Sequence, residues 1–151
     1  DLHVRSRRQR QMCIRDSLLC AFIISALLLI TTMVMDVLLQ STHLTQLLLN
    51  IDFLVDPKIV PTIVEVLIHL CIGLTIYVVF LIIYQYSKSL YYLAYFPLIV
   101  IFIIMYPFLI AIAQRSFFTF SWTEYFWWMI AHIIFMVLMA ICIPTISNKH
   151  L

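Results

Sequence analysis

The chain has 151 residues, of which 65% are hydrophobic and 11% are charged, with a formal net charge of +2. Soluble domains average about 45–50% apolar residues, so this composition excludes an ordinary soluble domain and predicts an integral membrane protein. The sequence contains one glycine. Glycine-rich phosphate-binding loops need several glycines, so nucleotide-binding enzymes of that kind are excluded.

The first sixteen residues resemble the in-frame translation of a transposase-type adapter used to build short-read DNA libraries. The resemblance is carried by Arg7–Asp16, which reads RRQRQMCIRD, and by Asp1–His3, which matches an upstream part of the same primer. It implies that residues 1–17 are a non-native segment and that native sequence precedes Leu18. We then expect residues 1–16 to make few specific contacts with the remaining chain. The alternative interpretation is a basic N-terminal arm.

Setting this segment aside changes the charge balance. It holds five of the nine basic residues, two of the seven acidic residues and one of the four cysteines. The rest of the chain then has four basic and five acidic residues, a net charge of −1. No basic tail remains that would indicate a nucleic-acid partner. The three remaining cysteines lie in apolar runs without zinc-site spacing, so we expect them to pack between helices.

Four apolar runs are long enough to cross a membrane as helices. They cover about residues 18–35, 62–86, 90–113 and 125–146. Helices are expected because lipid offers the backbone no hydrogen-bond partners. The connection at about 87–89 is short, which predicts a tight antiparallel hairpin. We therefore predict an all-α, four-span domain over residues 18–151 that folds as an integral membrane four-helix bundle.

Residues 42–55, between the first two runs, show a helical alternation of apolar and polar side chains. The apolar positions are Leu44, Leu47, Leu48, Ile51, Leu54 and Val55. Their spacing predicts an amphipathic helix of about three turns that lies at the membrane interface or caps the bundle. Pro57 and Pro61 should end it, because helix is disfavoured in the residue before a proline.

Other residues bear on the spans and their orientation. Pro97 and Pro107 each remove a backbone hydrogen bond from the third span and predict kinks. Tyrosines at 84–95 and tryptophans at 122–128 predict interfacial aromatic belts. Basic residues of 18–151 divide evenly between the two sides, whereas four acidic residues share the side of Lys58. We expect that side outside and the C-terminus in the cytoplasm of a bacterium.

Polar residues in or beside the spans form one candidate pocket. They are Asp36, Glu65, His69, Glu124 and His132. Glu65 and His69 are four residues apart and share a helix face, which Gly73 continues as a point of close backbone approach. Ionisable groups inside a membrane are costly, so they need partners or a function. If the second and fourth spans are adjacent, these five side chains converge, with Glu65 holding one histidine.

Part of the chain resembles small bacterial inner-membrane proteins of the YagU type. The resemblance covers roughly residues 52–140 and is carried by Pro61-x3-Glu65-x3-His69-x3-Gly73 and by the later residues Tyr106, Pro107, Phe120, Ser121, Trp122, Glu124 and His132. It implies a four-span fold with a histidine near the start of alternate spans, and it implies no mechanism.

Two function classes follow from these features. The first is a proton-linked carrier or transport accessory in which His69 and His132 titrate within a polar pocket. The second is a structural or interaction protein whose polar residues only join helices; an intramembrane enzyme acting on lipid is a third. The sequence has no metal-binding or serine-hydrolase motif. We expect no cofactor and no metal, and as partners the lipid bilayer and a second copy or another membrane protein.

Overall fold

The computed structural model describes residues 2–56 and 58–149, with the side chains of 14–56 and 58–148. Its helices are α1 (Leu2–Leu39), α2 (Leu44–Leu48), α3 (Thr62–Tyr86), α4 (Lys88–Ile112) and α5 (Trp122–Lys149). Four of these are long and apolar enough to cross a membrane. The predicted all-α, four-helix membrane bundle is therefore confirmed.

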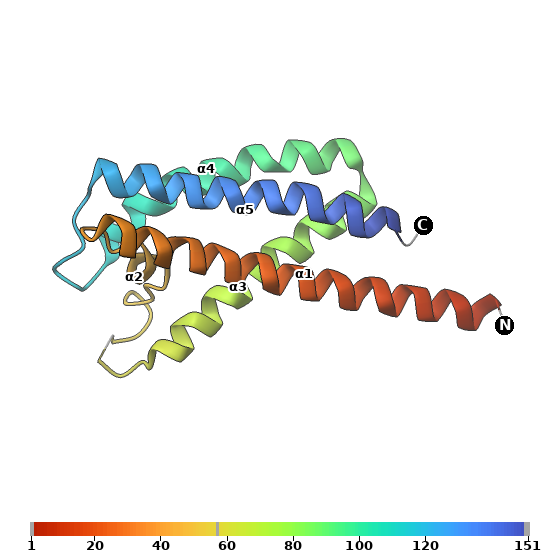
Figure 1. Cartoon of the computed structure of the whole chain (residues 1–151), viewed down its shortest axis with the longest axis horizontal. Helices are drawn as coiled ribbons and strands as arrows, with labels where there is room; N and C mark the ends of the chain where they lie inside the picture. The colour runs from red at the N-terminus through yellow and green to blue at the C-terminus, as the bar shows by residue number, and fades with distance from the viewer. Residues whose placement is uncertain (1, 57, 150–151) are drawn as a thin grey trace.

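The long helices are arranged as three nearly parallel rods and one oblique rod. Helices α1 and α5 lie side by side, α4 runs beside α5, and α3 crosses the bundle against α1 (Figure 1). Helices α3 and α4 meet at Ser87 and diverge toward their other ends, where α2 lies (Figure 1). The predicted hairpin is tight at its turn, but its two arms separate. Residues of both diverging arms line a cavity.

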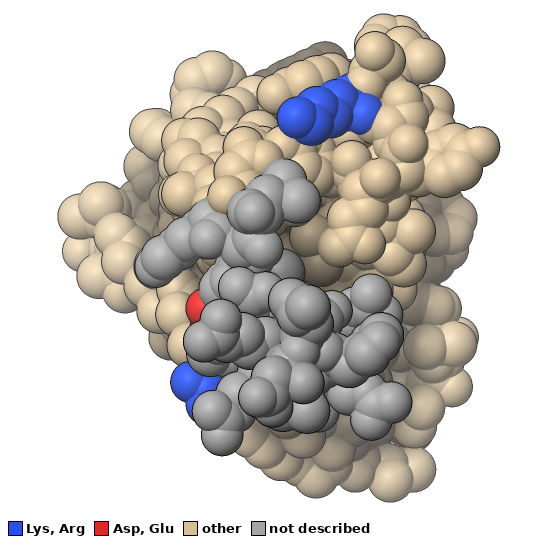
Figure 2. Space-filling model, turned by 90° about the vertical axis from the view of Figure 1, so that its right-hand side faces the viewer, with Lys and Arg blue, Asp and Glu red and all other residues tan. Residues whose placement is uncertain are grey.

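The outer faces of the bundle are apolar. Leu93 and Phe96 of α4 and Ile82 of α3 are among the exposed large hydrophobic side chains. Figure 2 shows the end of the molecule at which α3 joins α4, where the described surface carries only small basic and acidic spots. A soluble monomer rarely exposes apolar surface on this scale, so lipid is the solvent for these faces. The chain is an integral, multi-pass membrane protein.

Helix α1 begins well before the predicted span at 18–35. It is continuous from Leu2 to Leu39, and its N-terminal part extends past the end of α5 (Figure 1). The apolar stretch that could cross a membrane begins at Ile14. Ser17 is already buried. The side chains of residues 1–13 are not among those described. For these residues, the expectation of few specific contacts therefore falls outside the described part of the structure.

The predicted amphipathic helix at 42–55 is shorter than expected. Only Leu44–Leu48 is helical, because the Asn50 side-chain oxygen accepts the Asp52 backbone N–H at 2.8 Å and stabilises a turn that competes with helix. Leu44 and Leu47 are fully buried against Tyr106, Leu109 and Trp128. Of the two predicted positions, α2 therefore caps one end of the bundle.

Two prolines lie inside α4 without ending it. Pro107 has no N–H to donate to the carbonyl of Ile103, four residues earlier. The Tyr125 hydroxyl of α5 donates to that carbonyl at 3.1 Å, and the Trp128 indole N–H donates to the adjacent Phe102 carbonyl at 3.1 Å. The neighbouring helix thus supplies a donor to the Ile103 carbonyl, which Pro107 leaves without its usual helical partner.

Gly73 marks a close crossing of α1 and α3, as its position predicted. A Cβ built at Gly73 would lie 2.8 Å from the Cβ of Ser25 and would overlap the Ser25 hydroxyl. Ser25 is fully buried. The missing side chain therefore lets the two helices approach within direct contact.

The aromatic residues do not all form interfacial belts. Tyr91 and Trp128 are almost completely buried, and Tyr84 is also in the core, whereas Tyr86 and Trp122 are exposed. The Tyr91 hydroxyl donates to the Met139 carbonyl at 3.2 Å. The belt prediction is therefore wrong for the buried aromatics, because their polar tips find partners on other helices: backbone carbonyls for Tyr91 and Trp128, and the Asn148 side chain for Tyr84.

Candidate functional site

A cavity of about 430 Å³ lies where α3 and α4 diverge. All five helices and the segment that follows α2 contribute to its wall. Its titratable lining residues, among those described, are Glu65 and His69 of α3 and His132 of α5. The rest of the wall is mostly apolar, including Leu28, Leu98 and Phe135 of three different helices. The volume is within the range of about 300–1,000 Å³ typical of ligand pockets.

His132 is held in a fixed orientation on one wall of this cavity. Its ring lies 4.2 Å from the Trp128 ring and 4.4 Å from the Phe102 ring, centroid to centroid. Its Nδ1 is 2.8 Å from the Trp128 carbonyl oxygen, which can only accept. We therefore assign the hydrogen to Nδ1, which leaves Nε2 of a neutral ring as an acceptor.

His69 has a free hydrogen-bonding atom in the same cavity. The side chain is buried, and its Nε2 has no hydrogen-bond partner within the described part of the chain. A buried polar group without a partner costs about 1–3 kcal/mol. This nitrogen is therefore available to a polar group of a bound molecule.

Glu65 lines the cavity and binds an arginine instead of a histidine. Arg115 Nη2 lies 2.8 Å from Glu65 Oε1 and 3.2 Å from Asp52 Oδ1. Asp52 is fully buried, and the Gln114 side-chain amide donates to its backbone carbonyl at 2.8 Å. This ionic cluster, Asp52–Glu65–Arg115, ties the α2–α3 and α4–α5 segments to the start of α3.

Asp52 and Arg115 are absent from the sequence-based site. In the sequence, Asp52 falls among the polar positions of the predicted helix at 42–55, and Arg115 is one of the basic residues that bear on orientation. One signal did point to them: both lie between spans on the same side as Glu65. An unpaired charge next to a membrane is costly, so their pairing could have been proposed.

The remaining two predicted site residues, Asp36 and Glu124, do not line the cavity. The Asp36 carboxylate accepts from the Thr42 hydroxyl at 2.6 Å and from the backbone N–H groups of Leu44 and Thr45 at 2.9 and 2.8 Å. It therefore caps the start of α2.

Glu124 has a similar bracing position at the start of α5. Its carboxylate lies 3.1 Å from the His43 backbone N–H and 3.3 Å from the Tyr106 hydroxyl. Glu65 and Glu124 are both buried. Three of the five predicted side chains thus meet in one cavity, while Asp36 and Glu124 fasten α2 to the bundle.

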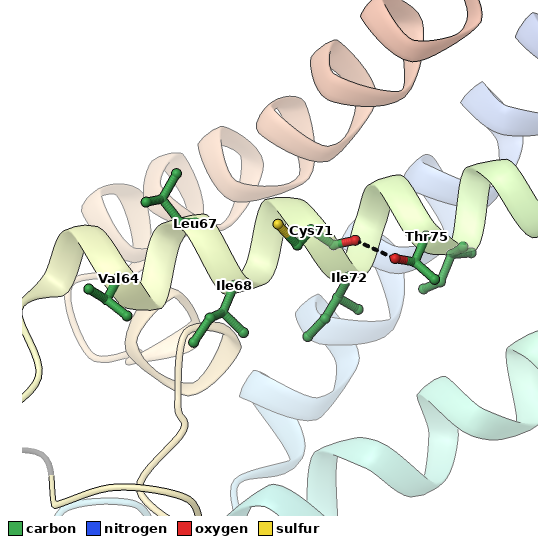
Figure 3. Close-up of a pocket in the computed structure, with 7 residues that line it drawn as sticks. Val64, Leu67, Ile68, Cys71, Ile72 and Thr75 are labelled. Carbon is green, nitrogen blue, oxygen red and sulfur yellow. Dashed lines mark hydrogen bonds between the residues drawn. The ribbon is translucent and has the colours of Figure 1, made fainter. Parts of the chain in front are cut away.

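A second hollow lies on the outer face of α3. It has a volume of about 400 Å³ and is lined by α3 alone, including Val64, Leu67 and Cys71. Figure 3 shows these side chains and the bond by which the Thr75 hydroxyl donates to the Cys71 carbonyl, at 2.8 Å. That hydroxyl is used within its own helix, so this hollow is an apolar, lipid-facing surface.

The described residues do not form a metal-binding site. Within the described ranges, no three His, Cys, Asp or Glu residues are grouped so that they could hold a metal ion. Cys20, Cys71 and Cys142 are free thiols. The polar side chains that line the central cavity include two histidines and one carboxylate.

Comparison with protein-family models, curated proteins and solved structures found no match. The resemblance of residues 52–140 to YagU-type proteins and that of residues 1–16 to an adapter both stay predictions.

Proposed function

We propose that this chain is a proton-linked carrier or transport accessory that binds a small molecule in its central cavity. The observation that carries the proposal is that His69 of α3 and His132 of α5 line one cavity inside a membrane bundle. Imidazole is the side chain whose ordinary pKa permits proton exchange near neutral pH. Glu65 is the other titratable group among the described lining residues. We further propose a bacterial cytoplasmic membrane, with the C-terminus inside.

A purely structural or interaction role is the second candidate. It is favoured by the buried polar groups outside the cavity, because Asp36, Glu124 and Arg115 all hold connecting segments in place. On that hypothesis the histidines would contribute only packing and hydrogen bonds between helices. The two candidates differ in what happens when a cavity histidine is removed.

Proton flux through reconstituted protein separates them. The full chain is placed in liposomes with an entrapped pH-sensitive dye, and the internal pH is followed after a step in external pH. We expect His69→Ala and His132→Ala to lower the flux to the level of protein-free liposomes, because each removes a proton-exchanging group. His43→Ala is the matched control, because His43 lies next to α2 outside the cavity lining.

The result that contradicts the carrier proposal is equally specific. If the parent chain gives no more flux than empty liposomes, or if both cavity variants retain the parent flux, the structural role is the better account. Folding of each variant is checked by its elution from a size-exclusion column in detergent.

A further inference from the structure

The wall of the cavity reaches the surface of the molecule between α3 and α4. Ile72 of α3 and Ile101 of α4 line the cavity and are also 55% and 49% exposed. Ile72 lies about 15 Å along α3 from Thr62, and Ile101 lies about 20 Å along α4 from Lys88, at 1.5 Å per residue. Both positions fall inside a hydrocarbon layer of about 30 Å. A molecule can therefore reach the cavity from the lipid, between the diverging α3 and α4.

The wall decides what kind of molecule fits. Most lining side chains are apolar, so the body of the occupant must be apolar too. At the histidines it meets two free ring nitrogens: Nε2 of His132, an acceptor, and Nε2 of His69, which lacks a partner among the described residues. A hydroxyl group matches the acceptor on His132, because it donates one hydrogen bond, and its oxygen can accept one from His69 in the tautomer that carries the hydrogen on Nε2.

The charges near the cavity disfavour an anionic head group. Glu65 lines the cavity, and the cation that lies beside it, Arg115, already contacts both Glu65 and Asp52. The cluster therefore carries a formal charge of −1. A carboxylate in the cavity would meet this charge and could not donate to His132, whereas an alcohol avoids both costs.

We infer that the cavity takes an uncharged amphiphile with an alcohol head group, which enters from the bilayer between α3 and α4. His132 accepts the hydrogen bond from the hydroxyl, and His69 binds the same group with its free nitrogen. A role of this binding in transport rests on the proposed function, whereas the binding itself can be tested separately.

The test uses the full chain in phosphatidylcholine nanodiscs and a diazirine-bearing long-chain alcohol as the photoreactive probe. Labelled peptides are located by mass spectrometry. We expect saturable labelling of the α4 segment around Ile101 and Phe102, and non-saturable labelling of the lipid-facing hollow at Leu67 and Cys71, which is the internal control.

Competition reveals the head-group preference without any substitution. Unlabelled hexadecanol should reduce the α4 labelling about tenfold more effectively than hexadecane or ionised hexadecanoic acid, as one hydrogen bond to a neutral group predicts. Monooleoylglycerol as a further competitor distinguishes a glycerolipid from a simple alcohol. His132→Phe should remove the preference, and His43→Ala should leave it unchanged.

Each outcome decides the matter. Equal competition by the three sixteen-carbon compounds, or labelling that is as unsaturable on α4 as on the outer hollow, overturns the inference. Alcohol-selective labelling with no proton flux keeps the inference and contradicts the carrier proposal. Histidine-dependent flux with no selective labelling does the reverse.

Discussion

Arg115 is the residue on which several parts of the molecule depend. One guanidinium nitrogen contacts carboxylates from two segments, and both carboxylates are buried while the arginine side chain is 21% exposed. Asp52 has no hydrogen bond to its carboxylate oxygens from the described residues. Its ion pair with Arg115 is therefore what compensates its burial.

Replacing Arg115 alone should destabilise the fold more than replacing Arg115 together with the two acids that it binds. Arg115→Met leaves two buried carboxylates without a cation, so we expect a loss of about 3–5 kcal/mol in unfolding free energy. The triple variant Arg115→Met, Asp52→Asn, Glu65→Gln should recover most of that loss, because neutral amides need no counter-ion. Denaturation in mixed detergent micelles measures both.

Lys58→Met is the control for this prediction, since Lys58 is exposed in the same region. A single Arg115→Met variant as stable as the parent, or a triple variant no more stable than the single one, would contradict the assigned role of the cluster.

The crossing of α1 and α3 depends on small residues at one point of contact. Gly73 faces Ser25, which is fully buried. Since dispersion contacts drive helix association in lipid, this approach stabilises the pair only while both residues stay small. The same crossing supports the wall of the cavity, because Gly73 is one of its lining residues.

Gly73→Ala should therefore weaken the bundle, although alanine is the better helix former. Its Cβ would lie 2.8 Å from the Ser25 Cβ, so the helices must separate. We expect a net loss of about 1–2 kcal/mol, as overpacking exceeds the gain in helix propensity. Thermal denaturation in detergent checks this.

A compensating change makes the test sharper. Ser25→Gly combined with Gly73→Ala should restore most of the stability, because it removes the atoms that collide. Cys71→Ala, on the exposed face of α3, should change little. If the double variant is as unstable as Gly73→Ala alone, the contact between positions 25 and 73 is not what lowers the stability of the bundle.

The described residues contain four spans, an even number, so Leu2 and Lys149 should lie on one side of the membrane. The α3–α4 turn shares that side, and the segments before α3 and before α5 lie on the other (Figure 1). The proposed entry route into the cavity lies between these two sides, within the bilayer. Its proposed role requires this topology.

Single cysteines in a cysteine-free background give a direct measurement of the topology. We expect Lys58→Cys and Ser89→Cys to react with a membrane-impermeant maleimide from opposite faces of sealed vesicles, because one span separates them. Asn148→Cys should react from the same face as Ser89→Cys. Reaction of Lys58→Cys and Ser89→Cys from one face would exclude four spans in this order.

The apolar runs were sufficient to predict four membrane helices, because a span must satisfy every backbone group within itself. Gly73 as a contact point and the shared face of Glu65 and His69 were also predictable, since both follow from helical spacing. These features are local. They depend on residues within a few turns of one another.

Tertiary structure decided the features that depend on distant partners. Asp36 became a cap for α2, and Tyr91 became core, only because other segments supplied their hydrogen-bond partners. Arg115 lies 50 residues from Glu65 in the chain, and no spacing rule joins them. The cavity likewise exists because α3 diverges from α4 while α2 fills only one end of the bundle. Long-range packing fixed those positions, and with them the side chains that remain free to bind a ligand.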